Sequence, residues 1–416
     1  MLVTPMTGMG ATVSLPISLP KLFWRSFFPA ADGAYQRFSL QRLVVMLLFW
    51  PPFLGLLLIN RFCLWLDNLL FPAFRSIDIK QPVFVVGIPR SGTTFLHRLL
   101  AGDRQRFTTT TLWELIFAPS ILQRRCWLYL AALDRKLGAP GAGTLHWLER
   151  KLLGGLDGVH KTGLLDPEED YLALAPYLGC FLLILPFGDN AFWQLARLDR
   201  DASADQKKHL TGIYRGLMQR HLYVYGSDKT LLSKNPSFTP WLHSLVEEFP
   251  DARFIACTRT PYEAVPSQVS SILIGARVFS GKPDVSWWRR GLTDMLEHYY
   301  ETLMDCHQCW PEHRFQLVSM RYLAGAPMAT IDAIYQAFDL PVGQSYRHWL
   351  SKENETAKQY RSGHQYAGDA LGISCEEISQ RFAKPIHYFN FSDLQEPSIN
   401  GETFRGRSAA PAGCQF

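Results

Sequence analysis

Several features are scarce in this sequence, and each scarcity narrows the class of protein. Lys and Arg outnumber Asp and Glu by only 42 to 37 among 416 residues, so the chain lacks the strong positive field of a nucleic-acid-binding protein. Cysteine is rare and unevenly spaced, which argues against a disulfide framework and favours free thiols in a reducing compartment. Cys306 and Cys309 form a lone Cys-x-x-C pair without a second pair at zinc-site spacing, so we expect no metal.

Charge is missing altogether from the first 20 residues, which contain three prolines. Such a segment fits neither the charged start of a signal peptide nor a packed element, so residues 1–34 are expected to be disordered. The tail at 396–416 is rich in Gly, Ala and Ser, and it is expected to be loose.

An uncharged apolar run of 17 residues extends from Leu43 to Ile59 and is broken by Pro51 and Pro52. A spanning helix needs about 20 apolar residues and tolerates an internal proline pair poorly. We therefore predict that residues 35–78 form a kinked helical hairpin, with membrane association in or on the bilayer through residues 38–74. Packing against the rest of the fold or a partner chain, and a spanning helix, are the alternatives.

A loop with spaced glycines lies between a strand-like run at 83–86 and a helix-like run at 95–101. Glycines at both ends of such a loop let backbone N–H groups turn toward an anion, and the following helix presents its positive dipole end. The common nucleotide-triphosphate loop has a lysine where this chain has Thr93, and the nearest cation is Arg90. The phosphate-binding residues predicted here are Pro89, Arg90, Ser91, Gly92, Thr93 and Thr94.

Alternating elements predict the fold class. Strand-like runs at 83–87, 231–235, 253–258 and 315–320 are each followed by a helical pattern, which is typical of an α/β fold with a parallel sheet flanked by helices. The phosphate loop then lies at the carboxyl edge of the sheet, as in P-loop-containing nucleotide-binding folds. We assign the domain to residues 79–395, and a mainly helical insert at 103–230 is expected to build the acceptor side.

Three segments of the chain resemble the PAPS-dependent sulfotransferase family, where PAPS is 3′-phosphoadenosine 5′-phosphosulfate. Pro89 to Thr94 resemble the loop that holds the 5′-phosphosulfate, and Arg259 with Ser267 eight residues later resembles the pair that holds the 3′-phosphate. The basic segment at 358–366 looks like the family's closing loop, so the resemblance implies donor contacts from Arg361, Ser362 and Gly363. The similarity is of the bacterial type and extends from about residue 82 to about residue 391.

The resemblance also suggests catalytic residues. Lys234, in Lys234-Asn235-Pro236, is similar to a lysine of tyrosylprotein sulfotransferases and is expected to contact the bridging oxygen, with capping of a strand as its alternative. Glu114 comes 20 residues after Thr94, near the position of a catalytic glutamate in some relatives, and we expect it to act as the base. Its alternative is a helix-capping carboxylate. Other candidates for the base are His160, Glu168 and Glu169, the last two in a cluster that resembles a Pro-Glu-Glu-Asp segment of bacterial-type members.

The implied function is in-line transfer of a sulfuryl group from PAPS to a hydroxyl or amine, with release of 3′,5′-ADP and no metal. The acceptor is expected to be a small molecule, a lipid or a glycan, and nucleic acid is not implied. A nucleotide kinase or NTPase is one alternative, although it needs a lysine at the position of Thr93. A non-catalytic protein that retains the PAPS fold is another. We expect a cytoplasmic enzyme held against a membrane; the alternative is a lumenal enzyme behind one N-terminal span, for which glycosylation at Asn354 or Asn390 would be the sign.

Overall fold

The computed structural model describes residues 17–28, 30–139, 141, 143, 163–358 and 372–391. Within them the chain forms one five-stranded sheet in the order β2-β3-β1-β4-β5, and every neighbouring pair is parallel. This arrangement confirms the predicted α/β fold with a parallel sheet. The strands are β1 (Val83–Gly87), β2 (Phe107–Thr108), β3 (Thr230–Lys234), β4 (Arg253–Thr258) and β5 (Phe315–Ser319).

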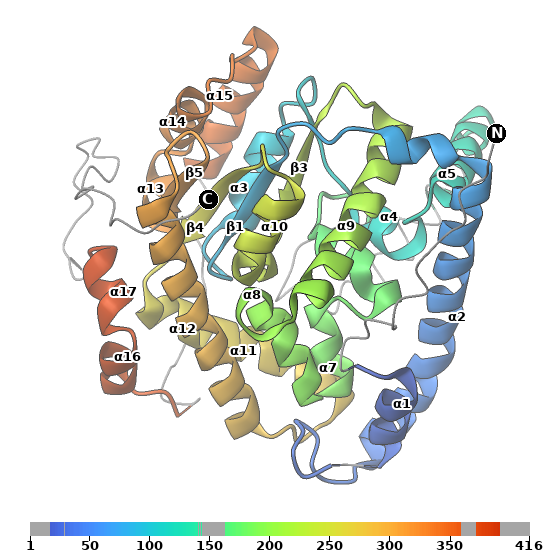
Figure 1. Ribbon diagram of the computed structural model, residues 1–416, viewed down its shortest axis with the longest axis vertical. Coiled ribbons are helices and arrows are strands. Elements are labelled where there is room, and N and C mark those ends of the chain that lie inside the picture. The colour runs from blue at the N-terminus through green and yellow to red at the C-terminus, as the bar shows by residue number, and fades with distance from the viewer. Residues whose placement is uncertain are drawn as a thin grey trace.

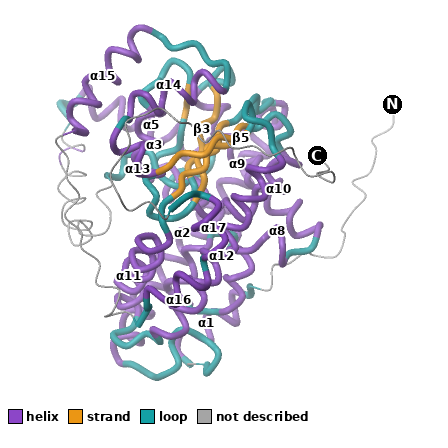
Figure 2. Tube along the Cα trace, turned by 90° about the vertical axis from the view of Figure 1, so that its left-hand side faces the viewer, coloured by secondary structure: helices purple, strands orange, loops and turns teal. Residues whose placement is uncertain are grey.

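Helices cover both sides of the sheet (Figures 1 and 2). The α-helices are α1 (Leu19–Phe27), α2 (Leu40–Leu70), α3 (Thr93–Ala101), α4 (Leu112–Phe117), α5 (Ile121–Lys136), α7 (Ile184–Phe187), α8 (Leu198–Asp201), α9 (Ala204–Tyr225), α10 (Leu242–Glu248), α11 (Pro261–Phe279), α12 (Val285–Cys309), α13 (Met320–Gly325), α14 (Pro327–Ala337), α15 (Gln344–Lys358), α16 (Cys375–Arg381) and α17 (Ala383–Tyr388). The 3₁₀ helices are η1 (Pro72–Ser76), η3 (Asp170–Tyr177), η4 (Phe181–Leu183), η5 (Asn190–Arg197) and η6 (Pro236–Trp241).

Strand alternation divides the core into two clusters. In β1 every residue is buried, and successive side chains point to opposite faces of the sheet. Val83 and Val85 belong to one cluster, which contains residues of α3, α14 and α15. Phe84 and Val86 belong to the other, which contains residues of α9, η6, α10 and α12. Because both faces are covered, the strands read as continuous apolar runs, which is why they were recognisable in the sequence.

The helical insert and the apolar N-terminal helix are both present, as predicted. Between β2 and β3 the described chain is helical, with α9 as its longest element. Residues 144–162 of the insert lie outside the described part.

Two details of the N-terminal prediction are wrong. Residues 1–34 were expected to be disordered, yet Leu19–Phe27 form α1, because Leu22 is buried in the core and Phe23 packs edge-on against Trp50 of α2. The predicted kinked hairpin is instead one helix of 31 residues, α2. Pro51 and Pro52 are both exposed, so the carbonyls that lose their helical partners lie on the outer side of α2, away from the core.

Candidate active site

The phosphate loop connects β1 with α3 and depends on two glycines. Gly87 has φ +121°, and a Cβ there would lie 2.2 Å from the carbonyl oxygen of Cys257. Gly92 has φ +87°, and a Cβ there would lie 2.3 Å from the sulfur of Met320. Both positions require glycine because φ is positive, which other residues rarely adopt. The space of a side chain is also occupied, by the backbone of Cys257 at Gly87 and by the side chain of Met320 at Gly92. Gly92 is also the N-cap of α3 and supplies no capping side chain, so the first N–H groups of the helix point into the loop.

Side-chain hydroxyls hold this loop in place. Ser91 is fully buried, and its hydroxyl hydrogen-bonds with the carbonyls of Ile88, at 2.5 Å, and Cys257, at 3.1 Å. Thr239 of η6 bonds to both backbone groups of Gly87, accepting from its N–H and donating to its carbonyl, each at 2.9 Å. The side chain of Ser91 therefore shapes the loop, and its backbone N–H remains the group suited to a phosphate.

Three of the predicted donor-binding residues converge beside the loop. Arg90 has φ +68°, and its Nε donates to the hydroxyl of Ser267 at 3.3 Å. Arg259, which directly follows β4, donates from Nη1 to the backbone carbonyl of Arg90 at 3.0 Å and from Nε to Glu263 at 2.7 Å. Tyr300 of α12 donates to the carbonyl of Arg259 and so fixes its backbone. Two guanidinium groups and a serine hydroxyl thus lie together next to the helix N-terminus, which suits a second phosphate.

Lys234 lies on the other side of β1, at the carboxyl end of β3. The parallel register pairs it with Val85, only two residues before the loop begins. The side chain is completely buried, and Nζ lies 3.4 Å from the hydroxyl of Thr94, 2.9 Å from Glu168 Oε1 and 3.3 Å from Glu169 Oε1. This ammonium therefore joins the phosphate loop to two carboxylates that precede it by 65 and 66 residues in the chain.

The acidic pair is positioned by the segment that follows β2. The N–H of Glu168 donates to the carbonyl of Thr110 at 3.1 Å, and Thr111 forms an antiparallel bridge with Pro167. The side chain of Glu168 is 11% exposed and that of Glu169 is 21% exposed, so both are screened from water but reachable. The arrangement combines a buried cation, a phosphate loop and two carboxylates within one group of contacts.

Electrostatics keep the cation charged and its neighbouring imidazole neutral. Burial lowers the pKa of Lys234, but Glu169 and Glu168 outweigh this effect and leave the pKa raised. Burial and the Lys234 ammonium lower the pKa of His97, on α3, well below its ordinary value. Asp170, the next residue after the acidic pair, is fully buried, and burial raises its pKa to about 7 although Tyr214 donates to it at 2.5 Å.

Glu114 has the contacts of a helix cap. Its Oε2 accepts from the N–H of Thr111 at 2.8 Å, and the two residues form a capping box at the start of α4. Burial raises its pKa, but Arg124, His221 and Tyr225 outweigh this and hold the pKa below its ordinary value. A carboxylate with a lowered pKa is a weak base, so these contacts favour the capping alternative over the catalytic one.

Four predicted residues lie outside the described part of the chain: His160, Arg361, Ser362 and Gly363. The remaining loop residues lie where they were expected, with Thr93 buried and Pro89, Gly92 and Thr94 half-buried. The sequence reasoning missed Thr239, His97 and Tyr300. No local motif marks them, since strand pairing and helix packing alone bring them to the loop.

The fold and the loop together define a class of protein. A parallel sheet whose central strand runs through a glycine-rich loop into a helix N-terminus is a P-loop nucleotide-binding fold, here without the lysine of the triphosphate loop. The model of one sulfotransferase family (Sulfotransfer_3) matches residues 82–344, more than half of the chain. The chain therefore belongs to the sulfotransferase family and is a member of the bacterial type.

Individual relatives agree with this assignment. The chain is 26% identical over 200 residues to the omega-hydroxy-beta-dihydromenaquinone-9 sulfotransferases Stf3 of Mycobacterium bovis and Mycobacterium tuberculosis. That alignment covers 47% of this chain and 46% of each relative, so the chain matches about half the length of these curated proteins.

Solved structures show the same fold. Sulfotransferase STF9 from Mycobacterium avium matches 91% of this chain and 97% of its own at a TM-score of 0.66, with 17% identity. STF1 from Mycobacterium tuberculosis matches 88% of this chain and 98% of its own at a TM-score of 0.60, with 20% identity.

Proposed function

We propose that this chain transfers a sulfuryl group from PAPS to the hydroxyl, or amine, of an apolar acceptor and releases 3′,5′-ADP. The observation that carries the proposal is the placement, on either side of one helix N-terminus, of a cationic cluster suited to a phosphate and of a buried lysine with two carboxylates. Arg90, Arg259 and Ser267 lie on one side, and Lys234 with its acidic pair lies on the other. The family membership supports the reaction class.

The donor-binding roles follow from the charges and the loop. Backbone N–H groups at the start of α3 and the hydroxyls of Thr93 and Thr94 are suited to the 5′-phosphate that leaves. Arg259 and Ser267 are assigned to the 3′-phosphate, and Arg90, which contacts both, connects the two phosphate sites. Because the donor carries an already activated sulfuryl group, positioning and charge stabilisation supply most of the catalysis, as in phosphoryl transfer.

Lys234 and Glu169 are assigned to the reacting atoms. In the proposed step the acceptor oxygen forms a bond to sulfur and loses its proton to Glu169, while the bond from sulfur to the 5′-phosphate oxygen breaks and its electron pair stays on that oxygen. The Lys234 ammonium stabilises this charge. Both carboxylates accept from Lys234, but Glu168 Oε1 also accepts from the N–H of Glu169, and Glu169 is the more exposed of the two, so we favour Glu169 as the base.

The acceptor class is proposed from the relatives and from the surface of the chain. The Stf3 proteins are named for a hydroxylated menaquinone, which is a lipid with a hydroxyl group. The same combination of an apolar body and one reactive hydroxyl suits a chain whose longest helix is apolar and largely exposed. We propose that the enzyme works at the cytoplasmic face of a membrane, where PAPS is supplied from the cytosol.

Isosteric variants test the assignment of the base. With radiolabelled PAPS and a long-chain prenyl alcohol in vesicles as the probe acceptor, we expect Glu169→Gln to lower turnover by about 10²-fold or more, because the proton has no acceptor. The affinity for 3′,5′-ADP, measured by calorimetry, should not change. Glu114→Gln is the matched control, and it should keep near wild-type turnover because glutamine also completes a capping box.

The reverse result would contradict the assignment. If Glu114→Gln loses turnover while binding 3′,5′-ADP normally and Glu169→Gln remains active, the base is Glu114. Failure of wild-type protein to label the prenyl alcohol, together with normal 3′,5′-ADP binding, would reject the lipid acceptor and leave the donor assignment standing.

A further inference from the structure

The outer side of α2 is apolar and exposed along its whole length. Nine large apolar side chains on this side are between 47% and 71% exposed: Leu40, Val44, Leu47, Leu48, Leu58, Ile59, Phe62, Trp65 and Leu69. The exposed Pro51 and Pro52 lie between Leu48 and Leu58. The opposite side packs into the core through Met46, Trp50, Leu57 and Leu64. Only 22% of its most apolar window, of mean hydropathy 2.2, is buried, so α2 is not an ordinary core helix.

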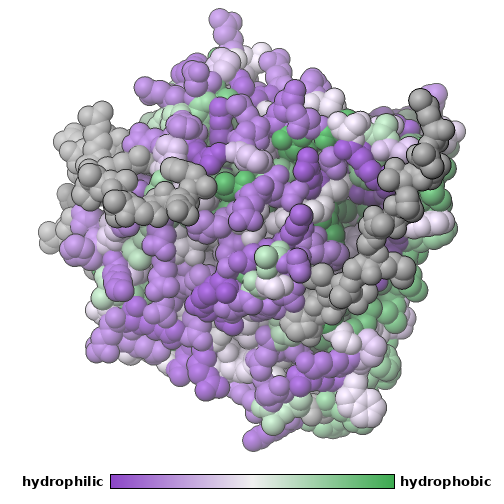
Figure 3. Space-filling view, viewed as in Figure 1, coloured by the Kyte–Doolittle hydropathy of each residue, from purple (hydrophilic) through white to green (hydrophobic). Residues whose placement is uncertain are grey.

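Neighbouring helices extend this surface. α1 packs on α2 and exposes Phe23, Trp24 and Phe28, while α5 packs on α2 and exposes Trp127, Leu128 and Tyr129. We call the exposed side chains of α1, α2 and α5 the apolar face. It follows the edge of the molecule on which α2 lies, where green atoms gather in Figure 3. Soluble monomers rarely expose a continuous apolar surface of this extent without a partner.

Within α2, exposed charge is confined to one edge of the apolar face. Of the three charged residues in α2, Arg42 and Asp67 are buried and only Arg61 is exposed. Arg61 and Asn68 are seven residues apart, or two helical turns, so they lie on the same edge of α2.

That edge adjoins a basic groove. Arg61 donates to the carbonyl of Pro176 at 2.8 Å and lies over the ring of Tyr177. Tyr177 and Asn68 line a groove of about 390 Å³, which is also lined by Arg75, Arg215 and Arg220. Cations beside an apolar, aromatic surface match a bilayer with anionic headgroups.

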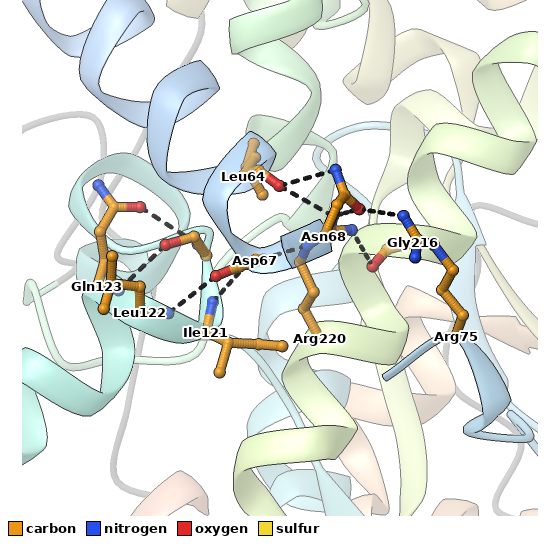
Figure 4. A network of polar contacts seen from close by, with 10 residues as sticks. Leu64, Asp67, Asn68, Arg75, Ile121, Leu122, Gln123, Gly216 and Arg220 are labelled. Carbon is orange, nitrogen blue, oxygen red and sulfur yellow. Dashed lines mark hydrogen bonds and ion pairs between the residues drawn. The ribbon is translucent and has the colours of Figure 1, made fainter. Parts of the chain in front are cut away.

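A buried polar network fixes α2 against the body (Figure 4). Asp67 accepts from the N–H groups of Ile121 and Leu122 at the start of α5, at 2.8 and 3.1 Å, and from Arg220 Nε at 3.0 Å. η3, which begins at Asp170 beside the acidic pair, also packs on α2. If α2 crossed a bilayer, η3 and the start of α5 would enter the hydrocarbon with it. These contacts favour an orientation of α2 along a membrane surface over one across the bilayer.

We propose that α1, α2 and α5 form a docking face that lies flat in the interface of an anionic bilayer, with Arg61 and Arg75 toward the phosphate headgroups. A second copy of this chain fits the face less well, because it would bring the same arginines near one another and the outer side of α2 offers no acid to pair with them. The docking face deepens the proposed function and rests on it for the choice of acceptor.

A pair of aromatic rings connects the docking face with the segment that positions the acidic pair. Trp127 of α5 is 40% exposed, and its ring lies 4.8 Å from that of Trp113 in α4. Trp113 lies three residues after Thr110, and the carbonyl of Thr110 accepts a hydrogen bond from the N–H of Glu168. A docking face joined in this way to the segment that holds the acidic pair supports hydroxylated membrane lipids as the proposed substrate class.

Vesicle flotation of the full chain tests the docking face. With vesicles of phosphatidylcholine and phosphatidylglycerol, we expect wild-type protein to float and Leu48→Asp/Leu58→Asp to float about tenfold less or weaker. Both leucines are more than 60% exposed, so these changes should leave the fold intact, which circular dichroism verifies. The matched control, Ser345→Asp/His348→Asp, adds two carboxylates at exposed positions of α15 and should float like wild type.

Charge variants test the basic edge. The floated fraction of Arg61→Gln/Arg75→Gln on anionic vesicles should be about tenfold lower than that of wild type. The floated fraction of wild type should fall by a similar factor when phosphatidylglycerol is left out of the vesicles. Equal flotation of wild type and Leu48→Asp/Leu58→Asp would overturn the proposal. The proposal would also be overturned if wild-type protein formed a soluble dimer that does not bind vesicles and if Leu48→Asp/Leu58→Asp converted this dimer to monomers. Flotation involves neither PAPS nor an acceptor, so its failure is distinct from failure of the proposed transfer, which 3′,5′-ADP binding reports.

Discussion

Lys234 carries its positive charge in a fully buried position, which is tolerable only because Glu168 and Glu169 surround it. A buried ion cluster of this kind contributes little net stability, but removing one member leaves the others uncompensated. Its value therefore lies in placing a cation and a carboxylate beside the phosphate loop. Strongly perturbed groups gathered in this way are typical of catalytic sites.

Asp170 makes the stability of the protein depend on pH. Burial raises its pKa from 3.8 to about 7, so between these values the folded state holds a proton that the unfolded state releases. The contribution of Asp170 is fully present below pH 3.8 and is lost as the pH rises through about 7, by at most roughly 4 kcal/mol.

Urea unfolding of wild type and Asp170→Asn between pH 5 and pH 8 measures this effect. Asparagine still accepts from Tyr214 but does not titrate. We expect the variant to gain stability relative to wild type as the pH rises. A difference that stays constant across the range would show that Asp170 remains ionised in the folded protein.

At the level of single residues, the sequence singled out donor-side residues that the structure brings together, but it left several candidates for the base. Arg259 and Ser267 are only eight residues apart, so a local sequence resemblance is enough to recognise them as a pair. The structure brings both residues into contact with Arg90. The acidic pair reaches Lys234 only through pairing of the chain at Thr110 and Thr111 with residues 167–168, which no local pattern encodes.

Among the elements, the loop and α3 depend most on backbone conformation. Gly87→Ala should destabilise the protein by about 3 kcal/mol or more, because the strand pairing of β1 with β4 leaves no space for a Cβ and φ is positive. Gly212→Ala is the matched control. Gly212 lies inside α9 with no atom within 4 Å of an added Cβ, so alanine should stabilise the protein by about 0.5–1 kcal/mol.

Denaturant unfolding distinguishes the two glycines. A Gly87→Ala protein as stable as wild type would mean that the close approach of Cys257 to the loop does not exist in solution. The prediction concerns the fold of the loop, and it does not depend on what the loop binds.

The elements also show where sequence patterns fail. The parallel strands were predictable because each is a short apolar run followed by a helix. α2 was predicted as a hairpin because a proline pair usually interrupts a helix. The structure keeps one helix, since both prolines face outward and the inner side is held by core packing and by Asp67.

In the whole molecule, four distant parts of the chain meet around one strand end. The loop after β1, Lys234 at the end of β3, Arg259 after β4 and the acidic pair of the insert all lie at the carboxyl edge of the sheet or against it. A parallel sheet brings the carboxyl ends of its strands to one edge, so this convergence follows from the topology. The sequence alone could place three of these parts, and it could not choose the fourth from among the candidates for the base.

The most direct test of the proposed PAPS site is a calorimetric titration with 3′,5′-ADP, adenosine 5′-phosphate and ATP. We predict that 3′,5′-ADP binds wild type tightly, and that Arg259→Ala weakens this binding by about 10- to 100-fold while leaving adenosine 5′-phosphate, which lacks the 3′-phosphate, unaffected. Arg347→Ala, at an exposed position of α15, is the control and should bind like wild type. If wild type binds 3′,5′-ADP no more tightly than adenosine 5′-phosphate, or prefers ATP, the assignment of the loop and of Arg259 to PAPS is wrong.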